Sequence, residues 1–228
     1  MVKKVSAPTL VEERKCWDLG EKVVVGVDEV GKGAWAGPLS VGAVVVPSDH
    51  RLNGIRDSKM LKAEQREKLY ERIDKWALTW SVGHASAREC DELGMAQAQI
   101  LATKRAVELL AMKPDRVLLD GKWNYVDWVP CTTLVGGDAR SLSIAAASVM
   151  AKVTRDRIMV ASSDNYHQYD FCNNKGYPTP RHLVALAGYG PSAIHRRSWS
   201  YMNNMVWSSE IRTLNQEHLL DSETPTDK

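Results

Sequence analysis

Short apolar runs rich in valine alternate with longer segments of helical spacing along most of the chain. Residues 23–28 and 39–46 are bounded by glycine and proline and predict two strands. Residues 78–86 alternate apolar and polar side chains, which predicts a half-buried strand. Two further apolar runs, residues 115–121 and 132–140, read as strands and each ends near an aspartate. The pattern therefore predicts five strands.

Three segments between and after these strands have the spacing of helices: residues 57–77, 94–112 and 143–161. Ser58 is the predicted N-cap of the first, and the second stops near Pro114. A loop, a short helix and a less regular C-terminal arm follow. Strands that alternate with helices predict an α/β fold, a mixed sheet with an antiparallel hairpin at its start and a C-terminal helical elaboration.

No internal repeat or linker divides the chain of 228 residues. We expect an N-terminal extension over residues 1–22, a main domain over 23–207 and an acidic tail over 208–228, with the last residues disordered. Residues 209–228 carry a net charge of −3, which leaves +5 on the rest of a chain whose total is +2. This mildly basic body is compatible with a polyanionic partner but does not require one.

The compartment follows from what the sequence lacks. The N-terminus has no apolar core of a signal peptide, and no apolar stretch approaches the roughly 20 residues of a membrane helix. The four cysteines match no metal or redox spacing and read as reduced thiols. We therefore expect a soluble, cytoplasmic protein that does not bind membranes.

Carboxylates follow the apolar strands at three places. Asp28 and Glu29 end the first run, Asp120 ends the fourth and Asp138 lies just beyond the fifth. Sites in α/β sheets form at the carboxyl ends of strands, so neighbouring strands would bring these acids together. Asp28 and Glu29 could both face one site only if the strand ended there and the backbone left its pleat.

Clustered carboxylates repel one another unless a cation lies between them. Carboxylate oxygens suit Mg²⁺ or Mn²⁺, and two such ions about 4 Å apart support hydrolysis of a phosphodiester. The alternative for any one of these acids is a helix cap or a solvated turn residue. Three acids at strand ends, one of them doubled, favour the metal site.

Six motifs occur in order between about residues 23 and 199: "GVDEVGKGAWAGP", "DSKML", "LLDG", "GGDARSLSIAAASVMAKVTRD", "NKGYPTPRH" and "YGPSAIHRRSW". Each motif alone is weak, but the ordered set resembles the type 2 ribonuclease H family, ribonuclease HII. The resemblance implies an RNase H-like fold.

The activity that this resemblance implies is that of a Mn²⁺- or Mg²⁺-dependent endonuclease acting on RNA–DNA hybrids and on single ribonucleotides in duplex DNA. The cut lies on the 5′ side of the ribonucleotide and leaves a 3′-hydroxyl and a 5′-phosphate. The family's four catalytic and metal-binding acids correspond to Asp28, Glu29, Asp120 and Asp138. Asp156 is a weaker candidate, because Arg155 and Arg157 beside it indicate a structural ion pair.

The turn Gly31-Lys32-Gly33 allows close approach of its backbone to a ribose 2′-hydroxyl. The family commonly has arginine at the middle position. Backbone contacts survive the change to Lys32, whereas a bidentate phosphate contact does not, since lysine is a point charge.

The resemblance also assigns substrate contacts outside this turn. Tyr177 corresponds to the family's tyrosine that stacks on the sugar at the RNA–DNA junction, with packing on the core as the alternative. Lys59, Ser148 and Lys152 correspond to positions near substrate phosphates, with a solvated surface lysine as the alternative for each lysine. Ser148 and Lys152 are four residues apart and share one helix face.

Other arginine and histidine side chains are less strongly indicated as site residues. Arg196 and Arg197 are weaker candidates for contact with the substrate backbone. His182 and His195 are expected to be structural, because a metal-bound water needs no histidine base.

Two other functions stay open at this point. A type 3 ribonuclease H shares fold and chemistry but cuts only hybrids, and the GKG and NKGY segments argue against it. A non-catalytic hybrid-binding module is of another class, and four intact acids argue against that. No protein partner is evident from the sequence, and a monomer is the family's usual state.

Overall fold

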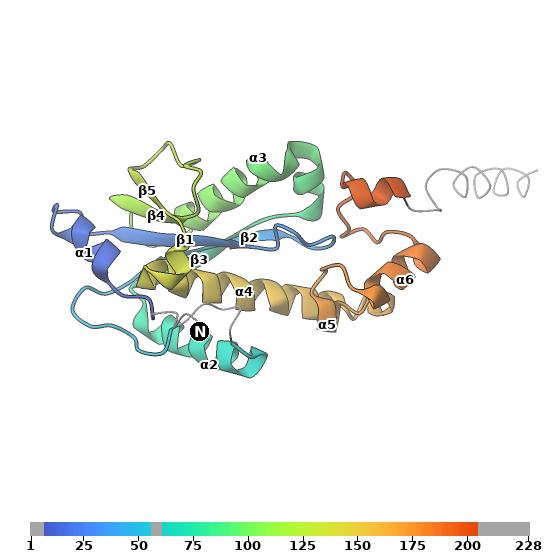
Figure 1. Ribbon diagram of the computed structural model, residues 1–228, viewed down its shortest axis with the longest axis horizontal. Helices are drawn as coiled ribbons and strands as arrows, with labels where there is room; N and C mark the ends of the chain where they lie inside the picture. Colours follow the sequence, from blue (N-terminus) through green and yellow to red (C-terminus); the bar gives the residue numbers. More distant parts are fainter. Residues whose placement is uncertain (1–6, 56–60, 205–228) are drawn as a thin grey trace, which may run out of the picture.

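The computed structural model describes residues 7–55 and 61–204. Five strands form one mixed sheet in the order β3-β2-β1-β4-β5, in which β3, β2 and β1 are antiparallel and β1, β4 and β5 are parallel (Figure 1). The strands are β1 Val24–Val30, β2 Leu39–Val45, β3 Thr79–Ala85, β4 Arg116–Asp120 and β5 Cys131–Leu134. The predicted mixed sheet and its opening hairpin are confirmed.

Helices cover both faces of this sheet. Helix α3 lies on one face, and α2 and α4 lie on the other (Figure 1). The helices are α1 Val11–Trp17, α2 Ala63–Trp76, α3 Ala87–Glu108, α4 Leu142–Ser162, α5 Phe171–Asn174 and α6 Pro180–Tyr189, with short 3₁₀ helices at η2 Gly137–Ala139, η3 His167–Tyr169 and η4 Ser200–Asn204. None of the helices in these described ranges is long and apolar enough to cross a membrane.

Strand β1 separates two apolar cores because its side chains alternate between the faces. Val25 and Val27 pack in the core beneath α3, whereas Val24 lies on the opposite face with Ile144 of α4. A second large cluster joins α2 and α4 to that opposite face. The same alternation decides where the acids of β1 point.

Helix α4 lies unusually close to β1 and β2. A Cβ atom on Gly26 would lie 2.2 Å from the backbone carbon of Ser143, and one on Gly42 would lie 2.3 Å from the carbonyl oxygen of Ala147. The facing side chains of α4 are correspondingly small, with Ala146 and Ala147 fully buried. This contact explains both the strand glycines and the alanine-rich start of the helix.

One predicted helix start is wrong and a second prediction left out a helical segment, and local capping accounts for both differences. Helix α2 begins at Ala63, and the side chain of Gln65 accepts a hydrogen bond from the backbone N–H of Lys62 at 2.9 Å. The proposed cap Ser58 lies outside the described residues. Helix α3 is kinked at Gly94 (φ +76°, ψ 159°), so the helical segment predicted from residue 94 is present. A further segment precedes it and begins at Ala87, because Ser86 and Glu89 form a reciprocal capping box.

The predicted C-terminal elaboration packs at one end of the sheet as a separate small cluster (Figure 1). Tyr169, Phe171 and Leu186 are buried there against Ala36 and Met159. Met159 belongs to the last turns of α4, and Ala36 to the turn between β1 and β2. The elaboration therefore contacts the turn that carries the GKG motif.

Gly42→Ala should lower the free energy of unfolding by about 1–3 kcal/mol, because its methyl group overlaps the α4 backbone. Gly188→Ala is the matched control: among the described residues no atom lies within 4 Å of its added Cβ, and its φ is not positive. This control should gain about 0.5–1 kcal/mol from helix propensity. Chemical denaturation of both variants measures the two effects, and equal stabilities would contradict the packing described.

Candidate active site

Asp28 and Glu29 lie inside β1, not beyond its end. Both pair with β2 in the antiparallel ladder, Asp28 opposite Gly42 and Glu29 opposite Val41. The condition under which both acids could face one site, a strand that ends at Asp28, is therefore not met. Asp28 points toward Ser148 of α4, and Glu29 points toward Gln99 of α3 on the other face. The side chains of the two acids therefore project from opposite faces of the sheet.

Asp28 is the most strongly perturbed acid of the site. Its side chain is buried, and its carboxylate accepts hydrogen bonds from the Ser148 hydroxyl and, at 2.8 Å, from the backbone N–H of Glu29. Burial is the main reason that its pKa rises to about 8, and the charges of Glu29 and Asp120 raise it further. A bound cation would offset the cost of ionising this buried carboxylate beside two more acids.

Asp120 is the last residue of β4 and follows the pair Val27–Leu119 in the parallel ladder. Continuing that register places it beside Asp28, as predicted from the strand ends. The backbone N–H of Gly137 donates to Asp120 Oδ1 at 2.7 Å. Asp138 is the next residue along, in η2, four residues after β5 ends. The hydrogen bond from Gly137 thus ties the loop of Asp138 to Asp120.

Helix α1 holds the loop of Asp138 from the other side. Glu13 is fully buried, and its Oε1 accepts hydrogen bonds from Ser141 Oγ at 2.6 Å, Ser143 N at 2.8 Å and Ser143 Oγ at 2.7 Å. Arg140 donates to Glu12 at 2.7 Å. The first turn of α4 is consequently anchored to α1, immediately after Asp138.

Glu29 has two side-chain partners. Gln99 Nε2 donates to Glu29 Oε2 at 3.2 Å, and Lys32 Nζ lies 3.4 Å from Glu29 Oε1. Gln99 is 2% exposed. The sequence reasoning missed this residue, although a glutamine on the buried face of an alanine-rich helix was a visible signal. It holds the Glu29 carboxylate on the α3 side of the sheet.

The donor set fits a hard divalent cation in chemistry. Across residues 7–55 and 61–204, no group of three or more histidine, cysteine, aspartate or glutamate side chains is already drawn together as a metal cluster. The charges of Glu29 and Asp120 nevertheless act on Asp28, and repulsion between these three acids opposes closer approach without a cation. These carboxylates suit Mg²⁺ or Mn²⁺.

The GKG turn begins with a glycine that the fold requires. Gly31 has a φ of +88°, and a Cβ there would lie 2.2 Å from Nε of Arg155. Gly33 differs, since no atom of residues 7–55 and 61–204 lies within 4 Å of its added Cβ and the residue is exposed. Within this part of the chain the backbone at Gly33 is therefore open on its Cβ side.

Two buried arginines organise this turn, and the sequence reasoning missed the first of them. Arg155 donates to the carbonyls of Ala36, Pro38 and Lys175 at 2.8–3.0 Å, and burial lowers its pKa to about 10. Arg196 donates to the carbonyls of Gly37 and Lys32. Arg196 is fully buried on protein carbonyls, so the expectation that it contacts the substrate backbone is wrong.

The ion pair predicted around Asp156 exists with different partners. Lys152 Nζ lies 2.8 Å from Asp156 Oδ1, and Arg66 lies 4.0 Å from the same carboxylate. Arg157 instead pairs with Glu67. Lys152 is therefore already paired with an acid of the protein, Asp156.

Tyr177 lies beside the face of helix α4 that carries Lys152. Its ring centroid is 5.7 Å from Lys152 Nζ and 5.3 Å from the guanidinium carbon of Arg155. Ser148 and Lys152 share this face of α4 and are about 6 Å apart along the axis. This face of α4 therefore connects Ser148, next to Asp28, with Lys152, next to Tyr177. Lys59 lies outside the described residues.

His182 and His195 are structural in the sense predicted. Both are buried, and their Nε2 atoms lie 2.9 Å apart. Neither belongs to the carboxylate group.

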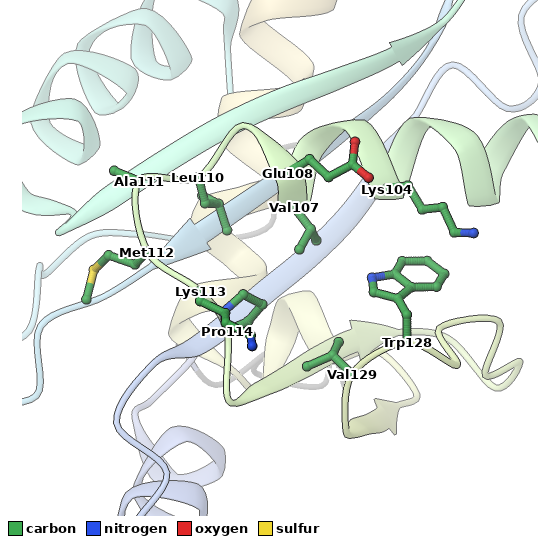
Figure 2. A pocket seen from close by; sticks show the side chains of 10 residues that line it. All are labelled: Lys104, Val107, Glu108, Leu110, Ala111, Met112, Lys113, Pro114, Trp128 and Val129. Atoms are coloured by element: carbon green, nitrogen blue, oxygen red, sulfur yellow. The ribbon is translucent and has the colours of Figure 1, made fainter.

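A pocket of about 530 Å³ lies elsewhere, between the end of α3 and the loop before β5 (Figure 2). Val107, Leu110, Trp128 and Val129 form its apolar wall, and none of the predicted site residues lines it. Lys104 Nζ lies 4.8 Å from the ring centroid of Trp128 at its rim. Asp28, Glu29 and Asp120 instead lie near the carboxyl ends of the interior strands β1 and β4.

Comparison with known proteins agrees with this geometry. The family model for ribonuclease HII matches residues 25–202. This chain belongs to the ribonuclease HII family. A ribonuclease HII of Streptomyces avermitilis is 45% identical over 186 residues, covering 81% of this chain and 79% of the relative. The chain is therefore an endoribonuclease, and RNA–DNA hybrids are the substrate class of its family.

Solved structures support the same fold. The crystal structure of ribonuclease H2 from Pyrococcus horikoshii OT3 has a TM-score of 0.67 and 27% identity, covering 81% of this chain and 97% of that one. The Bst-RNase HIII structure in complex with Mn²⁺ also has a TM-score of 0.67, covering 86% of this chain and 73% of that one. At 17% identity, the second shows the RNase H-like fold alone.

Asp28→Asn should stabilise the protein in the presence of a chelator. The raised pKa means that folding favours the protonated acid, so stability is complete below about pH 3.8 and is lost as pH rises toward about 8. Asparagine does not ionise and avoids this loss. Thermal unfolding between pH 4 and pH 8.5 should show the advantage of the variant growing to a few kcal/mol. A constant or shrinking difference would contradict the burial of a charged Asp28.

Proposed function

We propose that this member of the ribonuclease HII family is a divalent-metal-dependent endonuclease that cuts on the 5′ side of single ribonucleotides in duplex DNA as well as in RNA–DNA hybrids. The observation that carries the proposal is the buried Asp28 beside Glu29 and Asp120, next to a turn whose Gly33 backbone is open. The acids supply the chemistry and the turn supplies recognition.

Asp28, Glu29, Asp120 and Asp138 would hold the metal. When bound, Mg²⁺ or Mn²⁺ supplies an activated water and stabilises the leaving oxygen. The protein keeps the acids in place: Ser148 and the N–H of Glu29 orient Asp28, and Gln99 orients Glu29. The N–H of Gly137 orients Asp120. The structural relative Bst-RNase HIII, solved with Mn²⁺, supports the metal class.

The substrate residues lie on either side of these acids. The open backbone at Gly33 suits a ribose 2′-hydroxyl, the group that distinguishes RNA from DNA. Tyr177 would stack on the sugar at the junction, and Lys152 would meet a phosphate while it remains close to Asp156. Lys32 would exchange its contact with Glu29 for a phosphate. Ser148 supports Asp28 and reaches the substrate from the same face.

The cellular role that we propose is the removal of misincorporated ribonucleotides and of replication primers, by a cytoplasmic monomer. The family membership supports this role, and the mildly basic body supports a nucleic-acid partner. A protein partner is not part of the proposal.

Asp120→Asn should abolish cleavage while it preserves binding of the duplex. The amide keeps the shape and the hydrogen bond from Gly137 but removes a charge needed for the cation. Cleavage of a labelled duplex with one ribonucleotide should fall by roughly a hundredfold or more. Its Kd for that duplex, from fluorescence anisotropy, should stay within about threefold. Retained turnover would remove Asp120 from the catalytic group.

Gly33→Ala should fold normally but weaken recognition of the ribonucleotide. The added methyl group meets no atom of the residues that the structure describes, so we attribute any loss to the approaching substrate. We expect an unchanged Tm and a KM for the single-ribonucleotide duplex that rises by about tenfold, the cost of roughly one lost hydrogen bond. Unchanged kinetics would mean that this backbone does not contact the substrate. Gly31→Ala is the contrasting variant and should be destabilised.

A further inference from the structure

The loop that carries Tyr177 is fixed through three consecutive backbone carbonyls. Arg155 Nη1 donates to Lys175 O at 2.9 Å, and the N–H groups of Trp35 and Ala36 donate to Gly176 O at 2.8 and 3.1 Å. His182 Nδ1 lies 2.9 Å from Tyr177 O. Three different elements thus hold three successive peptide groups, and the histidine holds the one at the tyrosine itself.

The hydrogen bonds around the two histidines define their tautomers. A carbonyl oxygen only accepts, so His182 Nδ1 carries the proton and donates to Tyr177 O. At the other end of the pair, the backbone N–H of Ser192 donates to His195 Nδ1 at 2.9 Å, so that atom is an acceptor. His195 Nε2 must then donate to His182 Nε2 across the 2.9 Å between them. The hydrogen bond at Tyr177 O and the hydrogen bond from Ser192 N–H therefore require the same pair of histidine tautomers.

The surroundings keep both imidazoles neutral, as this chain of hydrogen bonds requires. His182 and His195 are 0% and 2% exposed. Tyr169 and Phe171 pack on both rings, with centroids between 4.8 and 6.1 Å apart. Burial lowers the pKa of both histidines, that of His195 to about 3. A charged imidazole would replace the accepting nitrogen with a second donor and break the chain.

The position of the Tyr177 backbone decides where its ring lies. The ring is half-buried and lies over Lys152 and Arg155 at 5.7 and 5.3 Å. The backbone N–H of Tyr177 is held only locally, by Asn174 O at 3.0 Å. The hydrogen bond from His182 is therefore the contact that ties Tyr177 to the C-terminal helix α6.

We propose that His182, oriented by His195 and the N–H of Ser192, is a positioning residue that sets the height of Tyr177 above the sugar at the RNA–DNA junction. His182 thereby controls the preference for a single ribonucleotide over a continuous hybrid. This inference rests on the proposed contact of Tyr177 with the substrate. A continuous hybrid offers a ribonucleotide at every step, so it depends less on one sugar being met by one ring.

The test compares His182→Asn with His182→Phe. The asparagine amide lies near the position of Nδ1 and keeps a donor for Tyr177 O, whereas phenylalanine fills the cavity without one. The readout is the ratio of kcat/KM on a single-ribonucleotide duplex to kcat/KM on a continuous hybrid. We expect the ratio to fall by about tenfold in His182→Phe and by less than about threefold in His182→Asn. A general loss of folding would lower both rates together and leave the ratio unchanged.

Tyr177→Ala and the double variant with His182→Phe separate the possible failures. If Tyr177→Ala leaves the ratio unchanged, the proposed contact of Tyr177 is wrong. If Tyr177→Ala lowers the ratio but His182→Phe does not, the positioning role is overturned. The inference requires that His182→Phe has no further effect once Tyr177 is alanine. His167→Asn, at an exposed histidine of η3, is the matched control and should leave the ratio unchanged.

A second variant covers the case in which His182→Phe does not fold. His182→Gln moves the amide one carbon further from the backbone, so it loses the donor at the Nδ1 position but keeps a polar group that reaches His195. It should lower the ratio as His182→Phe does, and a ratio like that of the wild-type protein would overturn the inference.

Discussion

The close contact of helix α4 with strands β1 and β2 is the constraint on which the site depends. Glycines in the strands and alanines in the helix let the two backbones approach until Ser148 reaches the buried Asp28. Farther along, the same rigid helix presents Lys152 and Arg155. One element therefore fixes the distance between the acids that would perform the cleavage and the loop that would recognise the sugar. A bulkier side chain at this contact would move both parts at once.

The second organising feature is the use of buried polar groups as ties between backbone segments. Arg155 and Arg196 have backbone carbonyls as hydrogen-bond acceptors, and these carbonyls come from the turn after β1 and the loop before Tyr177. A buried guanidinium is costly unless its donors are satisfied, so each of these turns is held in one conformation. The neutral pair of His182 and His195 extends the same principle into the C-terminal elaboration. The proposed recognition would thus rest on a preorganised surface and not on a deep pocket.

Much of this fold could be predicted from the sequence, because strands and helices differ in the period of their hydrophobic positions. The hairpin, the parallel strands and the acids near their ends all follow from local patterns. The start of α2 depends on a cap at Gln65, and the segment of α3 before the kink at Gly94 depends on the Ser86–Glu89 pair, and neither cap was predicted. The strand end at Asp28 was also misplaced, since pairing with β2 continues through two polar positions that no local pattern marks.

The side-chain partners of the site depend on contacts between distant segments, which the sequence does not reveal. Gln99 meets Glu29 across 70 positions, and Glu13 meets Ser143 across 130. Arg155 looked like a partner for Asp156 and is instead bonded to three carbonyls. The family resemblance predicts which residues act, and the fold shows which contacts hold those residues in place.

Cleavage of three labelled duplexes tests the central claim most directly. One duplex is all DNA, one carries a single ribonucleotide, and one is a continuous RNA–DNA hybrid. Each is incubated with Mn²⁺, with Mg²⁺ and with chelator. We predict a metal-dependent cut on the 5′ side of the single ribonucleotide, leaving a 3′-hydroxyl, together with cleavage of the hybrid and none of the all-DNA duplex. Cleavage in chelator, or cleavage of the hybrid alone, would contradict it.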